Sequence, residues 1–184
     1  MPQDHVIKYL LPIIPHWLKP NYLTFIRLVA SPLLIMFLNS REYKIGLVLF
    51  IILALTDLFD GSIARLRDQI TDWGKVWDPV ADKFLIGIVV VVLLYRANPI
   101  LAMAVVGLEL AFITGSAFLK LKYKDLVEIK SNIWGKLKMV CQCFGAGLLM
   151  LGFVVRQAVF LDIGEMLFYP ALFLGVLSIW KKGL

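Results

Sequence analysis

Residues 57–82 read DLFDGSIARLRDQITDWGKVWDPVAD and carry six of the thirteen acidic residues of the chain. Four of the six form two pairs with helical spacing: Asp57, Asp60, Asp78 and Asp82. Residues three or four apart share one face of an α-helix. At about 100° per residue, five residues of the first helix fit within an arc of about 140°: Asp57, Asp60, Gly61, Ala64 and Arg65. The spacing therefore predicts two helices, each with a carboxylate pair, joined by a short polar connection.

The sequence on both sides of this stretch is strongly apolar. Hydrophobic residues make up 60% of the 184 residues and charged residues only 17%, which is too apolar for a soluble domain of this size. Six apolar runs occur, each shorter than the about 20 residues that cross a membrane, so each must extend past a charged residue. We therefore expect an all-α, polytopic protein in which residues 1–184 form a single integral membrane domain. The six predicted transmembrane helices are 21–39, 44–66, 77–95, 98–121, 133–156 and 160–180.

The charges predict how the protein is oriented in the membrane. The segment from His5 to Lys19 is apolar but contains prolines and is too short to span, so we expect a short N-terminal interfacial helix. Of the nineteen Lys and Arg residues, fifteen fall on the side of the termini and four on the other. The positive-inside rule then places both termini and the acidic site on the cytoplasmic side of the inner membrane. The net charge of +6 is explained by attraction to anionic lipids or anionic substrates, so we do not expect the protein to bind nucleic acid.

Several charged residues are expected at one depth. Arg27, Asp57, Asp82 and Glu109 each lie about twelve or thirteen residues from the charged residues of the opposite side, which is about 18 to 20 Å of helix. Ionisable groups inside a membrane are costly and indicate function with a partner. The spacing therefore predicts one polar layer to which four helices contribute.

Four clustered carboxylates require positive charge between them. Two divalent cations, Mg²⁺ or Mn²⁺, would neutralise them and clamp a diphosphate. Gly61 and Ala64 leave room for a flat ligand such as a nucleotide, and Arg65 offers a fork for phosphate. Three alternatives remain: ion pairs with neighbouring Lys and Arg, a divalent-cation transporter, and an aspartate-rich prenyltransferase. The nearly uncharged outer part of the helices favours a one-sided site over a transport path, and prenyltransferases resemble longer helical bundles.

The acidic stretch resembles the signature of the CDP-alcohol phosphotransferase family, D-x-x-D-G-x-x-A-R, eight residues, G-x-x-x-D-x-x-x-D, at every position. The opening PNYLTFIR at residues 20–27 is similar to the P-N-x-L-T-x-x-R of the bacterial phosphatidylglycerophosphate synthase branch. DPVADK at 78–83 and WGKLK at 134–138 also resemble segments of that branch. The resemblance implies transfer of a phosphatidyl group from CDP-diacylglycerol to a small phosphorylated alcohol in a membrane-bound homodimer.

The resemblance also implies roles for individual residues. Asp57, Asp60 and Asp78 would hold the metal ions, with Asp82 also near them. Asp82 would be the catalytic base that takes the proton of the acceptor hydroxyl while CMP leaves. The further binding residues implied are Thr24, Gly61, Ala64, Arg65, Gly74, Lys83, Lys136 and Lys138.

One departure concerns the acceptor. The branch usually carries an Arg-Glu pair in the fourth helix, whereas this chain has Leu108 before Glu109. Glycerol 3-phosphate is the expected acceptor, with phosphatidylglycerol or inositol phosphate as alternatives. Lys136 and Lys138 are candidate phosphate-binding cations in place of the missing arginine.

Overall fold

The computed structural model describes residues 20–66, 71–123 and 133–182, and every regular element within these ranges is a helix. The predicted all-α class is confirmed. The predicted interfacial helix between His5 and Lys19 lies outside the described residues. The chain divides into two compact units, Met1–Ile88 and Val89–Leu184.

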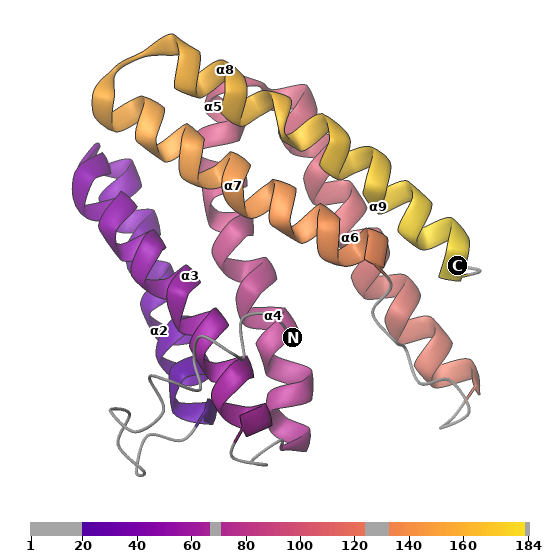
Figure 1. Ribbon diagram of the computed structural model, residues 1–184. Helices are drawn as coiled ribbons and strands as arrows, with labels where there is room; N and C mark the ends of the chain where they lie inside the picture. Colours follow the sequence, from indigo (N-terminus) through magenta and orange to yellow (C-terminus); the bar gives the residue numbers. More distant parts are fainter. Residues whose placement is uncertain (1–19, 67–70, 124–132, 183–184) are drawn as a thin grey trace. The chain divides into compact units, whose positions relative to one another are not determined.

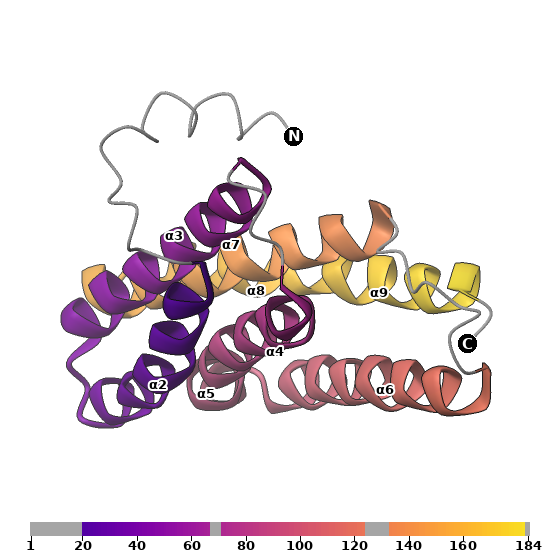
Figure 2. The ribbon, with the colours of Figure 1, turned by 90° about the horizontal axis from the view of Figure 1, so that it is seen from below.

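The first unit contains α2 (Pro20–Asn39), α3 (Tyr43–Leu66) and α4 (Asp72–Val89), the last of which ends at the boundary between the units. Figure 1 and Figure 2 show α2 and α3 side by side, as an antiparallel hairpin. The hairpin brings the start of α2 next to the end of α3. The acidic half of α3 therefore lies beside the first turns of α2.

One stripe of α2 faces the interior of this unit. Its buried residues follow helical spacing and are Thr24, Arg27, Ser31, Leu34 and Leu38. The stripe is polar over the first turns and apolar over the last. Helix α3 contacts α2 and also buries apolar side chains such as Phe50 and Leu53, while the polar part of the α2 stripe meets the acidic residues.

The turn between α2 and α3 is a helix C-cap in which Arg41 adopts φ 62°. The Glu42 N–H donates to Phe37 O at 2.9 Å, and the Arg41 N–H donates to Leu38 O at 3.3 Å. These two bonds form a Schellman motif, which satisfies the last carbonyls of the helix. The position usually favours glycine, so Arg41 holds a conformation that few side chains adopt.

The second unit contains η1 (Val90–Leu94), α5 (Tyr95–Ala97), α6 (Pro99–Tyr123), α7 (Ile133–Val155), α8 (Ala158–Met166) and α9 (Phe168–Lys182). Helix α7 lies along α8 and α9 (Figure 2). Asn98 caps α6, because its Oδ1 accepts a hydrogen bond from the Leu101 N–H at 3.1 Å. Pro99 then occupies the first helical position, where no N–H is needed.

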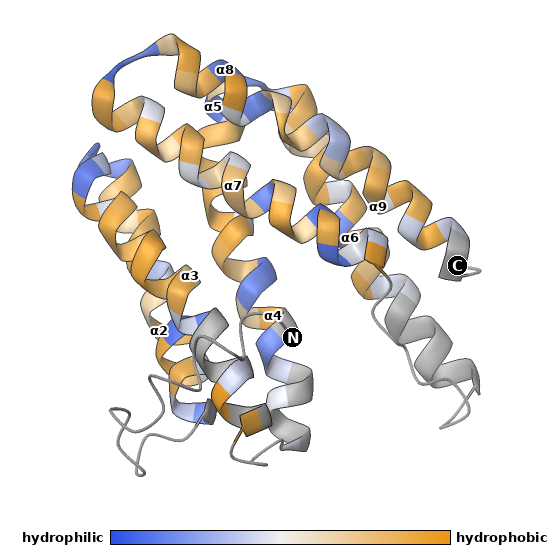
Figure 3. Cartoon of the chain, in the orientation of Figure 1, coloured by the Kyte–Doolittle hydropathy of each residue, from blue (hydrophilic) through white to orange (hydrophobic). Residues whose placement is uncertain are grey.

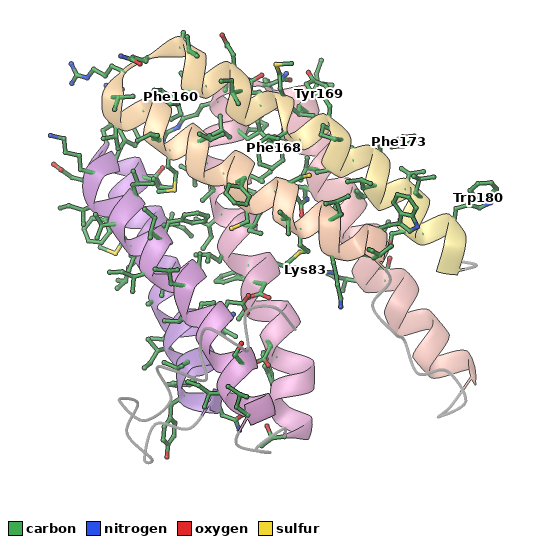
Figure 4. All side chains as sticks on the ribbon, viewed as in Figure 1. Lys83, Phe160, Phe168, Tyr169, Phe173 and Trp180 are labelled. Atoms are coloured by element: carbon green, nitrogen blue, oxygen red, sulfur yellow. The ribbon has the colours of Figure 1, made fainter. Side chains whose placement is uncertain are left out.

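Glycines allow α7 to pack closely against α8 and α9. A Cβ added at Gly145 would lie 2.9 Å from Phe168 Cε2, and one at Gly152 would lie 2.6 Å from Leu161 Cδ2. Figure 4 shows Phe168 at this helix contact. Such close approach is typical of helices that associate within a membrane.

Among the described residues, three helical segments are long and apolar enough to cross a membrane: Asn21–Asn39, Ile133–Val155 and Ala158–Trp180, the last of which comprises α8 and most of α9. Pro99–Gly115 is a shorter apolar helix. Hydrophobic residues dominate these segments (Figure 3). On α9, Tyr169, Phe173 and Trp180 project outward and are more than half exposed, as expected of a surface that meets lipid (Figure 4). The protein is therefore a membrane protein.

Two helices differ from their predicted bounds. The third begins at Asp72 rather than residue 77, because its first turn is polar and the apolar run does not include it. It is followed by a π-helical segment, Val90–Leu94, which the apolar pattern does not predict. The segment predicted as one helix over 160–180 is divided at Leu167 into α8 and α9.

Candidate active site

The polar start of α2 is the centre of the site. Asn21, Thr24 and Arg27 are spaced by three residues and therefore share one face of the helix. Thr24 is 1% exposed and Arg27 is fully buried. Both side chains are polar, so both need partners in the interior.

Arg27 joins the carboxylates of two other helices. Its Nη1 lies 3.0 Å from Oδ1 of Asp57 on α3 and also donates to Oδ1 of Asp82 on α4. The predicted meeting of Arg27, Asp57 and Asp82 is confirmed, whereas the predicted place of Glu109 in the same layer stays a prediction. Arg27 is fully buried, so the loss of its carboxylate partners would leave its charge uncompensated in the interior.

A second contact ties α4 to α2. The Thr24 hydroxyl donates a hydrogen bond of 2.6 Å to Oδ1 of Asp78. Asp78 and Asp82 are four residues apart on α4 and present the same face of that helix. Three of the four predicted aspartates thus contact the polar stripe of α2.

The start of α4 is fixed by two residues that the sequence reasoning missed. The Thr71 hydroxyl oxygen accepts a hydrogen bond from the Gly74 N–H at 3.0 Å, and the hydroxyl donates to Asn21 Oδ1 at 2.9 Å. Thr71 is therefore the N-cap of α4 and anchors it to α2. A threonine three residues before Gly74 is a recognisable cap pattern, but its bond to Asn21 depends on the tertiary fold.

Gly74 lies where these contacts meet. A Cβ at this position would be 3.3 Å from Thr71 Oγ1 and 3.4 Å from both Asn21 Oδ1 and Asp78 Oδ2. A side chain here would be tight against the Thr71 hydroxyl and would contact Asn21 and Asp78. The absence of a side chain at Gly74 therefore leaves room for the Thr71 cap.

The site carboxylates are oxygen ligands of the kind that hard divalent cations prefer. Within residues 20–66, 71–123 and 133–182 no group of three or more His, Cys, Asp or Glu in metal-binding geometry is found, and the Asp60 side chain lies outside what is described. Asp57 and Asp82 nevertheless bring carboxylates from two helices together at Arg27. Carboxylate oxygens are the preferred ligands of Mg²⁺, so the donor set fits such an ion.

The remaining predicted residues of the first unit divide into two groups. Lys83 is half-buried and projects from α4 (Figure 4). Gly61, Ala64 and Arg65 lie on the same helix as Asp57, within α3, but their side chains are outside the described residues.

The second unit contains another buried charged group. Lys138, which is 2% exposed, pairs through Nζ with Oε1 of Glu109, and Gln142 Nε2 donates to the same oxygen at 3.0 Å. The ammonium also lies 4.4 Å from the centre of the Phe112 ring, within the range of a cation–π interaction. Lys136, by contrast, is exposed.

Leu108 packs beside this group. A Cβ added at Gly175 would collide with Leu108 Cδ2 and would lie 3.3 Å from Lys138 Cδ. The leucine thus fills a notch over Gly175, next to the aliphatic part of Lys138. The residue that departs from the resembled pattern is part of a closely packed contact between α6 and α9.

Fold and site together define a helical membrane protein with a carboxylate-rich polar layer. Residues 17–177 match the family described as CDP-alcohol phosphatidyltransferase, so the match covers most of the chain. The chain belongs to this family. It is therefore an enzyme, a phosphatidyltransferase, as its resemblance to the family signature implied.

Curated relatives agree with this assignment. The CDP-diacylglycerol--glycerol-3-phosphate 3-phosphatidyltransferase of Rickettsia typhi is 35% identical over 165 residues, which cover 86% of this chain and 91% of that protein. The Bacillus subtilis protein of the same name is 29% identical over 138 residues, 74% of this chain and 70% of that protein. A probable cardiolipin synthase (CMP-forming) of Drosophila melanogaster is 35% identical over 114 residues, 61% of this chain and 35% of that protein. These similarities favour an enzyme over a cation transporter.

Proposed function

We propose that this protein transfers a phosphatidyl group from CDP-diacylglycerol to glycerol 3-phosphate, releasing CMP and forming phosphatidylglycerophosphate. The Rickettsia typhi and Bacillus subtilis relatives carry names that describe this reaction. The observation that carries the proposal is the contact of Asp57, Asp78 and Asp82 with one polar stripe of α2. A diphosphate substrate requires this kind of preorganised charged layer.

Asp57, Asp60 and Asp78 would hold divalent cations, Mg²⁺ or Mn²⁺, with Asp82 beside them. Two such ions, when bound, would neutralise the diphosphate of CDP-diacylglycerol and orient it for displacement. Thr24 supports this arrangement by fixing the orientation of Asp78, since its hydroxyl contacts the carboxylate at 2.6 Å.

Asp82 acts as the general base. It accepts the proton of the acceptor hydroxyl, whose oxygen forms a bond to the β-phosphorus while the bond from that phosphorus to the bridging oxygen breaks. CMP leaves with the bonding electrons. A positioned carboxylate of this kind typically contributes about 10² to 10⁴ in rate.

The nucleotide would lie over the carboxylate-bearing faces of α3 and α4. Gly61 and Ala64 provide room for the cytidine, and Arg65 and Lys83 provide cations for its phosphates. Gly74 has no side chain, which leaves room for the Thr71 cap at the start of the helix that carries Asp78.

The two lysines of the WGKLK segment are proposed to have different roles toward the acceptor. Lys136 is exposed and suits direct contact with the phosphate of glycerol 3-phosphate. Lys138 is already paired with Glu109, which makes it a weaker candidate for direct contact with the phosphate than Lys136. Leu108 removes one cation that the resembled branch usually has, which makes Lys136 the main phosphate contact.

The proposed topology has six spans with both termini and the site in the cytoplasm of an inner-membrane homodimer. The supporting observations are the fifteen Lys and Arg on the side of the termini against four on the other and the three apolar spans. A scan of single cysteines for labelling in intact cells tests this orientation.

The acceptor is tested with the purified protein in detergent, CDP-diacylglycerol and Mg²⁺. Lipid products are identified by mass spectrometry with glycerol 3-phosphate, phosphatidylglycerol, inositol phosphate or no acceptor. We expect phosphatidylglycerophosphate with glycerol 3-phosphate and no other phosphatidyl product. A product formed with only another acceptor would retain the chemistry and overturn the proposed substrate.

A further inference from the structure

The proposed reaction leaves open the role of Arg27, which is buried beside the site carboxylates. It is fully buried and is the largest of the fully buried side chains among the described residues. Burying a charged side chain is costly unless an opposite charge lies beside it, so Arg27 needs carboxylate partners in the interior. Its partners, Asp57 and Asp82, are partly exposed, with 38% and 19% of their side chains accessible. Arg27 therefore contacts the carboxylates from the buried side, while part of each carboxylate stays accessible.

The geometry joins both carboxylates through one atom. Nη1 of Arg27 contacts Oδ1 of Asp57 and Oδ1 of Asp82, which come from different helices. Holding two oxygens at one donor fixes the separation of the carboxylates and the packing of α3 and α4 against α2. Guanidinium does not lose its proton in proteins, so this positive charge is permanent.

We propose that Arg27 is a positioning residue, a permanent internal counter-ion that holds Asp57 and Asp82 together in the metal-free protein. This inference rests on the proposed function, in which these carboxylates meet a divalent cation. Arg27 keeps the layer assembled before the cation arrives and reduces the negative charge that attracts the cation.

Replacement of the charge has two consequences. In Arg27→Gln, two carboxylates lose their common counter-ion, so the melting temperature without divalent cation should fall by roughly 5 °C or more. Mg²⁺ then supplies the missing charge. The Mg²⁺-induced rise in melting temperature should be at least about twice that of the wild type, since the cation compensates for more repulsion.

A double variant separates charge from packing. In Arg27→Gln/Asp57→Asn the extra negative charge is removed as well, so the metal-free melting temperature should recover at least half of the loss. If Arg27 served only to fill space, Asp57→Asn would restore nothing. Arg27→Lys is the matched control: it keeps the charge and should lose less stability than Arg27→Gln.

The experiment measures thermal unfolding of detergent-purified wild type, Arg27→Gln, Arg27→Lys and the double variant, with EDTA and across a Mg²⁺ titration. Equal Mg²⁺-induced shifts in wild type and Arg27→Gln, or no recovery in the double variant, would overturn the inference. If Arg27→Gln cannot be purified, recovery of folded protein in the double variant supports the inference and its failure opposes it. CMP release by the wild type is measured in parallel. If the wild type releases no CMP, the proposed function fails, while the melting temperatures still decide whether Arg27 is a counter-ion to the carboxylates.

Discussion

The hydroxyl of Thr24 on α2 lies 2.6 Å from Oδ1 of Asp78 on α4, although 54 residues separate them in sequence. With Arg27 one turn further along α2, this contact aligns the acidic layer on a single helix face. The site therefore depends on the polar stripe of α2 as much as on the aspartates that the motif contains.

Loss of the Thr24 hydroxyl should impair turnover more than folding. In Thr24→Val, Asp78 loses a donor, and we expect a decrease in kcat of about tenfold with a loss of stability of about 1 to 3 kcal/mol. Thr24→Ser keeps the hydroxyl and should remain within about threefold of the wild type. CMP release and thermal unfolding measure the two effects, and equal activity of the two variants would exclude a role for the hydrogen bond.

Asp82→Asn tests the general base. The amide keeps the size of the carboxylate but cannot accept the proton, so we expect kcat to fall by about 10² or more. The KM for CDP-diacylglycerol should change little, because the acceptor rather than the donor lipid gives up that proton. Turnover within about threefold of the wild type would contradict the assignment.

Gly74 and Gly87 lie on the same helix and provide a matched pair. The methyl of Gly74→Ala would crowd the Thr71 hydroxyl, which caps α4 and so helps to place Asp78, and we therefore expect a stability loss of about 1 kcal/mol and a decrease in activity of severalfold. A Cβ at Gly87 meets nothing within 4 Å, so Gly87→Ala should be neutral or stabilise by about 0.5 to 1 kcal/mol through helix propensity. The opposite order in thermal unfolding would show that the space around Gly74 is not limiting.

The two lysines of the WGKLK segment should respond differently to substitution. Lys136→Gln removes an exposed cation and should raise the KM for glycerol 3-phosphate severalfold with an unchanged melting temperature. Lys138→Met leaves the partly exposed Glu109 beside Gln142 without its ammonium partner and should destabilise the protein by about 1 to 3 kcal/mol. Adding Glu109→Gln should recover part of that loss. If Lys136→Gln alone lowers the melting temperature, the proposed division of roles is wrong.

The helices were largely predictable because apolar runs end at charged or turn residues. The segments predicted at 21–39 and 44–66 correspond to α2 (Pro20–Asn39) and α3 (Tyr43–Leu66). The start of α4 was missed because its first turn is polar and depends on the Thr71 cap. The division at Leu167 and the π-helical segment at Val90–Leu94 lie within apolar runs, so hydropathy alone does not predict them.

Within the site, spacing along the helices predicted that Arg27, Asp57 and Asp82 would meet at one depth. It did not predict that one guanidinium nitrogen would join both carboxylates, because register between helices is set by packing. The Thr71–Asn21 bond and the Lys138–Glu109 pair connect residues 50 and 29 positions apart, and no local pattern indicates such pairs.

The central claim is that the carboxylate layer carries out phosphatidyl transfer to glycerol 3-phosphate. The most direct test is simultaneous measurement of CMP and phosphatidylglycerophosphate in the wild type and in Asp78→Asn, with CDP-diacylglycerol, glycerol 3-phosphate and Mg²⁺. The account predicts equal amounts of both products in the wild type and at least about a hundredfold less of both in the folded variant. Wild-type protein that releases no CMP, or a folded Asp78→Asn variant with undiminished turnover, would contradict it.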